Sequence, residues 1–163
     1  MAQIPDSTQV VVAGAGPTGL TLAALLRRAG AEVVVLDRAP RRGREARASV
    51  LHSRGIEILD GLDAAAPLLD DGERITRTAF YDTGIEVSEV RFDQLAAAFP
   101  FALGIGQNRV EAALLDRLEV LGTKVRRSAT VEAATDRGDG VTVEVRTAND
   151  STHTIEALSL IHI

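Results

Sequence analysis

The chain has 163 residues, and its 18 lysines and arginines against 23 aspartates and glutamates give a formal net charge of −5. Hydrophobic residues make up 45% of the chain, which excludes a disordered polypeptide, and the absence of cysteine excludes disulfides, thiol nucleophiles and cysteine-bound metal sites. The acidic balance, the few aromatic residues and the lack of a long apolar stretch or a basic leader argue against nucleic acid and membranes as partners, and favour a cytoplasmic protein.

The first forty residues predict a strand, a helix and a second strand. Residues 9–13 are an uncharged, β-branched run, which is typical of a parallel strand buried on both faces. Residues 17–29 are rich in leucine and alanine, with arginines near the end and Gly30 as a helix stop. Residues 31–36 are again apolar and end at Asp37, so this segment is expected to form a right-handed βαβ unit.

The middle of the chain, residues 64–106, is expected to leave this unit as an excursion. A helix is predicted before it over residues 49–62, although Gly55 weakens the pattern. Within the excursion, the turn signal at residues 82–84 separates two short apolar runs, residues 78–81 and 85–90, which predicts a hairpin.

The last third of the chain predicts a helix and an antiparallel meander. Asn108 and Glu111 have the spacing of a capping box, and apolar residues then recur at helical period as far as Gly122. Apolar and polar residues alternate in the central strand of the meander, so one of its faces is expected to be buried. The three expected strands are residues 129–135, 141–147 and 152–157.

A glycine-rich pattern, G-x-G-x-x-G, lies between the first strand and the first helix. Gly14 allows the tight turn, Gly16 lets backbone amides approach a pyrophosphate, and Gly19 lets the helix pack closely on the sheet. Phosphate charge is favoured at a helix N-terminus, where Pro17 is also tolerated. A structural turn without a ligand is the alternative. The residues predicted to bind a dinucleotide are Gly14, Ala15, Gly16, Pro17, Thr18 and Gly19.

Asp37 stands at the end of the second predicted strand, where a carboxylate accepts hydrogen bonds from the ribose of an adenosine. An acid at this position disfavours a 2′-phosphate, which argues against NADP in this site. The alternative is an ordinary surface acid at a strand end. The βαβ unit by itself is compatible with NAD and with FAD.

An ordered set of motifs resembles the N-terminal part of the FAD-dependent aromatic hydroxylases, which are single-component flavoprotein monooxygenases of the phenol, pentachlorophenol and polyketide type. The motifs are residues 10–20, the pair Asp37-Arg38, residues 47–59, and residues 107–111 followed by Leu114. The resemblance covers about residues 9–157. It implies an α/β fold, with a Rossmann-like FAD-binding βαβ sheet, a three-stranded β-meander and an inserted part of the substrate domain.

The resemblance also assigns cofactor contacts outside the glycine loop. Arg38 follows the ribose-binding acid, Arg47 reaches the flavin side and the pyrophosphate, and Gln107 binds near the ribityl chain or the phosphates. A guanidinium suits phosphate because it binds bidentately and stays charged. Without the resemblance, Arg47 would be interpreted as a solvated loop residue and Gln107 as a residue before a helix cap. No catalytic residue and no metal site are assigned.

The activity that the resemblance implies is hydroxylation of a small aromatic substrate, phenolic or polyketide, with FAD, O₂ and NAD(P)H as a transient co-substrate. Two alternatives stay open. One is another FAD-dependent oxidoreductase, such as a halogenase or a reductase, and the other is a nucleotide-binding fragment without turnover. An NAD-dependent dehydrogenase is disfavoured because it leaves the motifs at Arg47 and Gln107 unexplained.

The expected domain organisation is an FAD-binding unit with its following helix over residues 1–63, the excursion toward the substrate domain over 64–106, and a return helix and meander over 107–157. Residues 158–163 look unrelated to the family and are interpreted as an aberrant tail of a truncated chain. A truncated chain is expected to lack the parallel strand after the meander, and therefore to be marginally stable and to bind FAD weakly.

Overall fold

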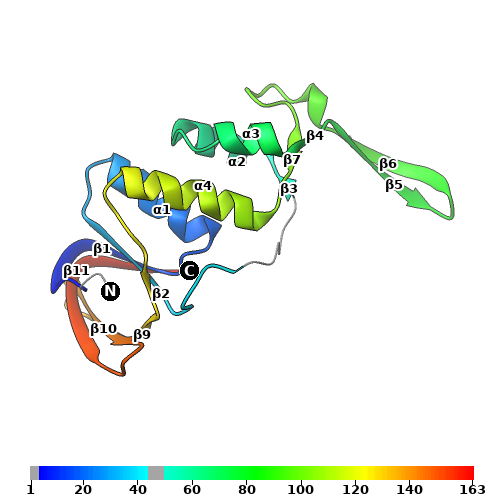
Figure 1. Ribbon diagram of the computed structural model, residues 1–163. Helices are drawn as coiled ribbons and strands as arrows, with labels where there is room; N and C mark the ends of the chain where they lie inside the picture. The colour runs from blue at the N-terminus through cyan, green and yellow to red at the C-terminus, as the bar shows by residue number, and fades with distance from the viewer. Residues whose placement is uncertain (1–3, 44–49) are drawn as a thin grey trace. The chain divides into compact units, whose positions relative to one another are not determined.

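The βαβ unit that the sequence predicts is present at the start of the chain. The computed structural model, which describes residues 4–43 and 50–163, places strand β1 at Ser7–Ala13, helix α1 at Pro17–Arg28 and strand β2 at Val33–Asp37. The two strands pair directly with each other and run parallel, and α1 connects them (Figure 1). Basic residues in the last turn of α1 suit the negative end of the helix dipole.

This unit belongs to a six-stranded mixed sheet with the strand order β8-β2-β1-β11-β10-β9. Strands β8, β2, β1 and β11 are parallel neighbours, whereas β11, β10 and β9 form an antiparallel meander. The predicted α/β class, a parallel βαβ sheet joined to a three-stranded meander, is confirmed. The bounds of the later strands are β8 Arg126–Arg127, β9 Ala129–Asp136, β10 Val141–Thr147 and β11 Thr152–His162.

Strand β11 belongs to both parts of the sheet. Its first half pairs antiparallel with β10, and its second half, from Glu156 to His162, pairs parallel with β1. The expectation that residues 158–163 are an aberrant tail and that the parallel sheet lacks a strand is wrong, because residues 158–162 continue β11, which pairs with β1 as far as His162. Figure 1 shows the red β11 beside the blue β1. The backbone of β1 therefore has partners on both sides.

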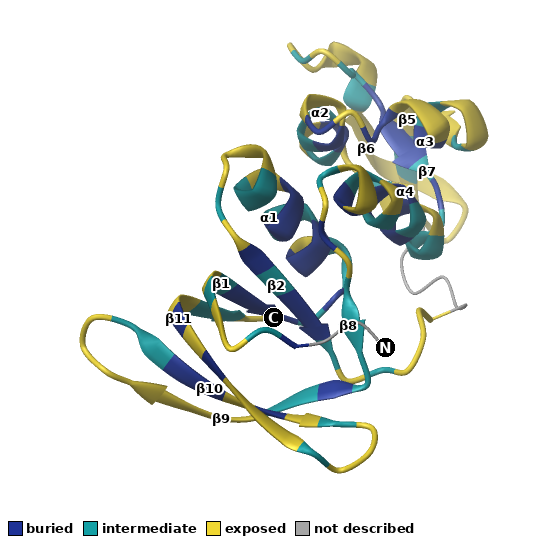
Figure 2. Ribbon diagram, turned by 60° about the vertical axis from the view of Figure 1, so that its left-hand side comes forward, coloured by how far each residue is buried: buried dark blue, intermediate teal, exposed yellow. Residues whose placement is uncertain are grey.

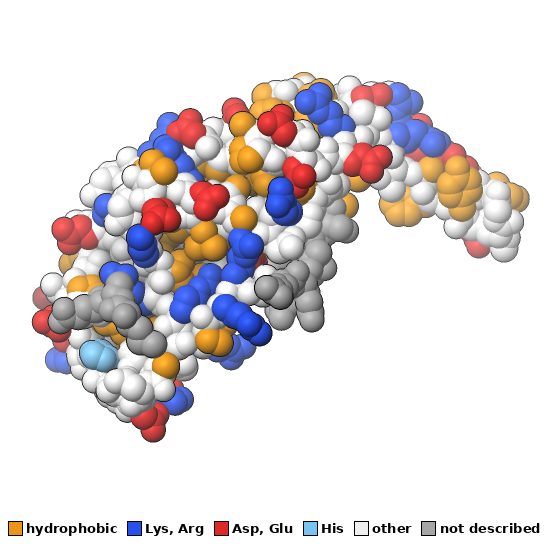
Figure 3. Space-filling view, viewed as in Figure 1, with side chains coloured by type: hydrophobic (Ala, Val, Ile, Leu, Met, Phe, Trp, Pro, Cys, Tyr) orange, Lys and Arg blue, Asp and Glu red, His pale blue; other side chains and the backbone are white. Residues whose placement is uncertain are grey.

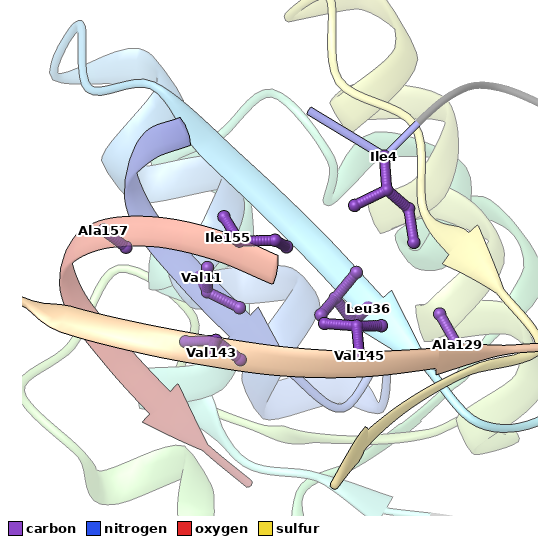
Figure 4. Close-up of a cluster of buried hydrophobic side chains, with 8 residues drawn as sticks. All are labelled: Ile4, Val11, Leu36, Ala129, Val143, Val145, Ile155 and Ala157. Atoms are coloured by element: carbon purple, nitrogen blue, oxygen red, sulfur yellow. The ribbon is translucent and has the colours of Figure 1, made fainter. Parts of the chain in front are cut away.

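The core of this unit lies between the parallel strands and the meander. Val11, Val143, Val145 and Ile155 are fully buried in it. Central strands are covered on both faces, which is why β2 is mostly dark blue in Figure 2 whereas the outer strand β9 is mostly yellow. Figure 4 shows the cluster, which consists of Ile4, Val11, Leu36, Ala129, Val143, Val145, Ile155 and Ala157.

The rest of the described chain contains short elements and a small antiparallel sheet of order β3-β7-β4. The helix predicted over residues 49–62 is correct only from Ser53, since Val50 and Leu51 pair with Leu103 and Gly104 instead. The bounds are β3 Val50–Leu51, α2 Ser53–Gly61, α3 Ala66–Asp71, β4 Glu73–Ile75, β5 Arg77–Asp82, β6 Ile85–Arg91, the 3₁₀-helix η1 Phe92–Gln94, β7 Ala102–Gly104 and α4 Gln107–Val120.

The predicted hairpin is confirmed as β5 and β6, and most of its side chains are exposed. Arg77 of β5 pairs across the hairpin with Glu86 and Glu89 of β6. Charged and apolar side chains share the surface of this segment, which is at the right of Figure 3. The large apolar side chains that stay exposed are Phe80, Tyr81, Ile85, Val87 and Val90.

The described chain divides into two compact units at positions that differ from the expected ones. One unit is Met1–Arg44 with Leu114–Ile163, and the other is Glu45–Ala113. Helix α2 was expected to belong with the βαβ unit and lies in the second unit instead. The boundary between Ala113 and Leu114 falls inside α4.

Candidate cofactor site

The turn between β1 and α1 has a backbone shape that glycine permits. Gly14 has a φ of +118°, in a region that side chains with a Cβ rarely adopt. Its amide donates a hydrogen bond to the carbonyl oxygen of Leu36 at 2.8 Å, which ties the turn to the end of β2. The first glycine of the motif thus has the role that the sequence predicts.

Gly19 lies in α1 where the helix passes closest to the turn. A Cβ built on Gly19 would lie 2.0 Å from the carbonyl oxygen of Gly14 and 3.4 Å from the side chain of Val12. Both the helix and the turn are fixed backbone, so no larger residue fits without separating them. This is the close helix–strand packing expected of the third glycine.

The N-terminus of α1 is open in front of Gly16. A Cβ built on Gly16 would meet no atom within 4 Å, and Gly16 is an N-cap residue without a side-chain cap. The first intrahelical bond runs from the Leu20 amide to the Gly16 carbonyl at 2.9 Å, so the amides of Thr18 and Gly19 have no acceptor within the helix. With no acidic residue in the first turn, this end attracts an anion.

Asp37 is held against the glycine loop through its carboxylate. Its Oδ2 accepts a hydrogen bond from the Ala15 amide and its Oδ1 accepts one from the Ala39 amide, each at 2.8 Å. The side chain is 16% exposed. The structure therefore brings the predicted acid next to the predicted phosphate loop, and each oxygen keeps a further acceptor site for a hydroxyl group.

Arg127, which the sequence analysis did not single out, forms an ion pair with Asp37. Its Nη1 lies 3.4 Å from Oδ2 of Asp37, and the two residues are register partners in the parallel pair β2–β8. The sequence could not predict β8, because a strand of two residues is too short to show an alternating pattern. The one feature that could have indicated the contact with Asp37 was the position of Arg126 and Arg127 just before the meander.

The remaining predicted cofactor residues are Arg38, Arg47 and Gln107. Arg38 follows β2 and is exposed, and Arg47 lies outside the described residues. Gln107 is the first residue of α4, in the second unit, and its Nε2 donates to Oε1 of Glu111 at 2.8 Å. The capping box predicted between Asn108 and Glu111 is wrong in its position, because the helix already begins at Gln107 and Asn108 lies inside its first turn.

Residues 4–43 and 50–163 contain neither a candidate metal cluster nor a candidate membrane-spanning helix. No three histidine, cysteine, aspartate or glutamate side chains of this part of the chain gather closely enough to hold a metal ion. None of the helices described has the length and apolar character that crossing a membrane requires.

The arrangement fits the adenosine diphosphate part of a dinucleotide. A diphosphate needs amide donors, a positive helix end and room for close approach, and these meet at Gly16. A ribose needs an acceptor for its hydroxyl groups, and the carboxylate of Asp37 stands beside the same loop.

Comparisons with known proteins agree with this geometry. A family model described as "FAD binding domain" matches residues 7–161. An anhydrotetracycline monooxygenase of Streptomyces rimosus is 38% identical over 158 residues, covering 93% of this chain and 29% of that protein. A dialkyldecalin synthase of Streptomyces rugosporus is 33% identical over 137 residues, which cover 84% of this chain and 28% of that protein. The chain thus spans less than a third of the length of these curated relatives.

A solved structure gives the same result for the fold. The OxyS anhydrotetracycline hydroxylase from Streptomyces rimosus superposes with a TM-score of 0.85 at 33% identity, covering 96% of this chain and 31% of that one. Because the family model covers nearly the whole chain, this protein belongs to the FAD binding domain family.

Proposed function

We propose that Gly14–Gly19 and Asp37 hold the adenosine diphosphate end of FAD. The support is the open N-terminus of α1 at Gly16 together with the hydrogen bond from the Ala15 amide to Asp37. Arg38, Arg47 and Gln107 are proposed as further FAD contacts because of the resemblance to the aromatic hydroxylases.

Each residue of the glycine loop has a separate task in this proposal. The amides of Thr18 and Gly19 donate to the pyrophosphate, and Gly16 leaves room for it because it has no side chain. Asp37 accepts hydrogen bonds from the ribose hydroxyl groups, and its charge repels a 2′-phosphate. The site therefore selects FAD over a phosphorylated nicotinamide dinucleotide.

For the whole protein we propose an NAD(P)H-dependent monooxygenase that hydroxylates an aromatic substrate, phenolic or polyketide, with O₂. The observation that carries this proposal is the 38% identity to a monooxygenase over nearly the full chain. Bound flavin would supply the activation of O₂, and the chain described here would bind and orient that flavin.

A second candidate is an FAD-dependent enzyme that does not insert oxygen. The dialkyldecalin synthase, at 33% identity, supports it, because its name describes a synthase rather than a monooxygenase. Both candidates need the same cofactor site, so they differ only in the turnover of O₂ and NAD(P)H.

The cofactor site is tested by titrating the chain with FAD, followed by visible absorbance, and with ADP, followed by calorimetry. Wild type is expected to bind both ligands, in contrast to the weak FAD binding expected from the sequence, because β11 supplies the parallel strand that was expected to be missing. Gly16→Val is expected to lose both, because its side chain would fill the space in front of the helix end, and to keep the thermal midpoint of wild type within a few degrees. Failure of wild type to bind ADP and FAD would contradict the proposed site.

The activity is tested by NAD(P)H oxidation with added FAD, with and without phenolic compounds, and by analysis of the products. Oxidation stimulated by a phenol, with a hydroxylated product, supports the monooxygenase. FAD binding without oxidation or product contradicts monooxygenase activity for this chain and leaves the cofactor-binding role.

A further inference from the structure

The ion pair between Arg127 and Asp37 differs from the surface ion pairs of this protein in its burial. The side chains of Arg127 and Asp37 are 22% and 16% exposed, whereas those of Lys124 and Glu119 are 68% and 62% exposed. Exposed pairs contribute little because water and salt screen them. A partly buried pair at the edge of a ligand site has a stronger electrostatic effect on its neighbours.

The sheet determines which arginine meets Asp37. In the parallel pair β2–β8, Asp37 is the register partner of Arg127, and Leu36 is that of Arg126. Successive side chains of a strand point to opposite faces, so Arg126 and Arg127 differ in what they can reach. Arg127, the register partner of Asp37, is the arginine that forms the ion pair with it.

The carboxylate of Asp37 keeps acceptor capacity despite its partners. Its two oxygens offer about four acceptor sites. The Ala15 and Ala39 amides take one each, at 2.8 Å. Nη1 of Arg127 lies 3.4 Å from Oδ2, so this ion pair is a third contact on the carboxylate and leaves the remaining acceptor sites open.

We propose that Arg127 is a positioning residue for the adenosine end of the cofactor: it fixes the Asp37 carboxylate in the orientation that accepts the ribose hydroxyl groups. This inference rests on the proposed FAD site. Arg127 also lines two hollows, of about 490 and 340 Å³, and its side chain is only partly buried. A permanently charged, planar group suits this role because it keeps its charge and its shape at all physiological pH values.

The test compares two ligands that differ only at the ribose. ADP carries the 2′- and 3′-hydroxyl groups, and 2′,3′-dideoxy-ADP does not. Calorimetry measures the affinity of both for wild type, Arg127→Met, Arg127→Lys and the matched control Arg126→Met. Thermal unfolding of each variant reports any loss of stability.

Wild type is expected to bind ADP more tightly than the dideoxy analogue. Arg127→Met is expected to weaken ADP binding by about tenfold and to leave dideoxy-ADP binding nearly unchanged. Arg127→Lys should restore part of the preference, since it keeps the charge, and Arg126→Met should behave like wild type. If Arg127→Met does not fold, the same comparison is made with Arg127→Lys. Its preference for ADP over the dideoxy analogue should be smaller than that of wild type.

Three results would overturn the inference. One is unchanged ADP affinity in the folded Arg127 variants. The second is an equal loss for both ligands, which would indicate a phosphate contact or a purely structural role. The third is an equal effect of Arg126→Met. If wild type itself binds neither ligand, the proposed function fails, which is a different result from any of these.

Discussion

Two antiparallel strand pairs of this chain, β10–β11 and the hairpin β5–β6, share an alternating pattern and have different surroundings. In β10 and in β6, β-branched apolar residues alternate with polar ones. Val143 and Ile155 face each other in the first pair and are fully buried, whereas Ile85 and Val87 of the hairpin are 68% and 61% exposed. Alternation therefore predicts a strand, but the structure that covers the strand decides whether its apolar side forms a core.

The two pairs are also held together differently. Strand β11 has β1 as a second partner, so its register is fixed by two ladders and by the side chains packed between them. The hairpin has one ladder and cross-strand ion pairs from Arg77. We expect substitutions in the first pair to change the free energy of unfolding strongly, and substitutions in the hairpin to have small effects.

The largest difference is expected between two isoleucines. Ile155→Ala should lower the free energy of unfolding by about 2–5 kcal/mol, because it removes a buried side chain and leaves a cavity. Ile85→Ala should change it by less than about 0.5 kcal/mol, because its side chain is exposed. Urea denaturation of both variants measures this, and equal effects would show that the comparison of the two pairs is wrong.

A second contrast lies within the glycine loop of the first unit. Gly19→Ala should destabilise the protein by about 1–3 kcal/mol or more, because its Cβ would lie 2.0 Å from the Gly14 oxygen. Gly16→Ala should cost less than about 1 kcal/mol, because its Cβ meets nothing within 4 Å. Thermal unfolding tests this, and a Gly16 variant that is as unstable as the Gly19 variant would contradict the open helix end.

A third prediction concerns binding. Asp37→Asn should weaken ADP binding by about tenfold, because an amide has one acceptor oxygen and no charge, while two backbone amides and Arg127 face this group. Asp82→Asn, at the end of β5 in the hairpin, is the matched control and should bind ADP as wild type does. Calorimetric titration measures the ADP affinity of both variants. Wild-type affinity of the Asp37 variant for ADP would show that Asp37 does not contribute to the site.

The smallest effect on stability is expected from the ion pairs of the hairpin. The hydrogen bond from Arg77, followed by that from Tyr81, holds the pKa of Glu86 below its ordinary value. A lowered carboxyl pKa in the folded state adds stability that is present above the ordinary carboxyl pKa and is lost as the pH falls through the lowered value. Arg77→Met should raise the Glu86 pKa toward its ordinary value, as measured by NMR titration. An unchanged pKa would show that this ion pair does not form in solution.

The local elements and the glycine loop could be predicted because their signals are local. The run before Gly14, the helix after Pro17 and the end of the second strand at Asp37 follow one another within forty residues, and the structure has the strand, helix and strand there. The wrong predictions for residues 50–51 and 158–162 needed a distant partner. Val50 and Leu51 continue a helical pattern, but β7 pairs with them as a strand.

The sequence by itself determined the βαβ unit, the meander strands and the acid beside the phosphate loop, because periodicity, glycine and strand ends act over a few residues. Only the tertiary structure decided that β11 continues past the meander to pair with β1, and that Arg127 lies beside Asp37. Both depend on the register between strands far apart in the chain. Register is set by packing and hydrogen bonding across the whole sheet, which no local pattern contains.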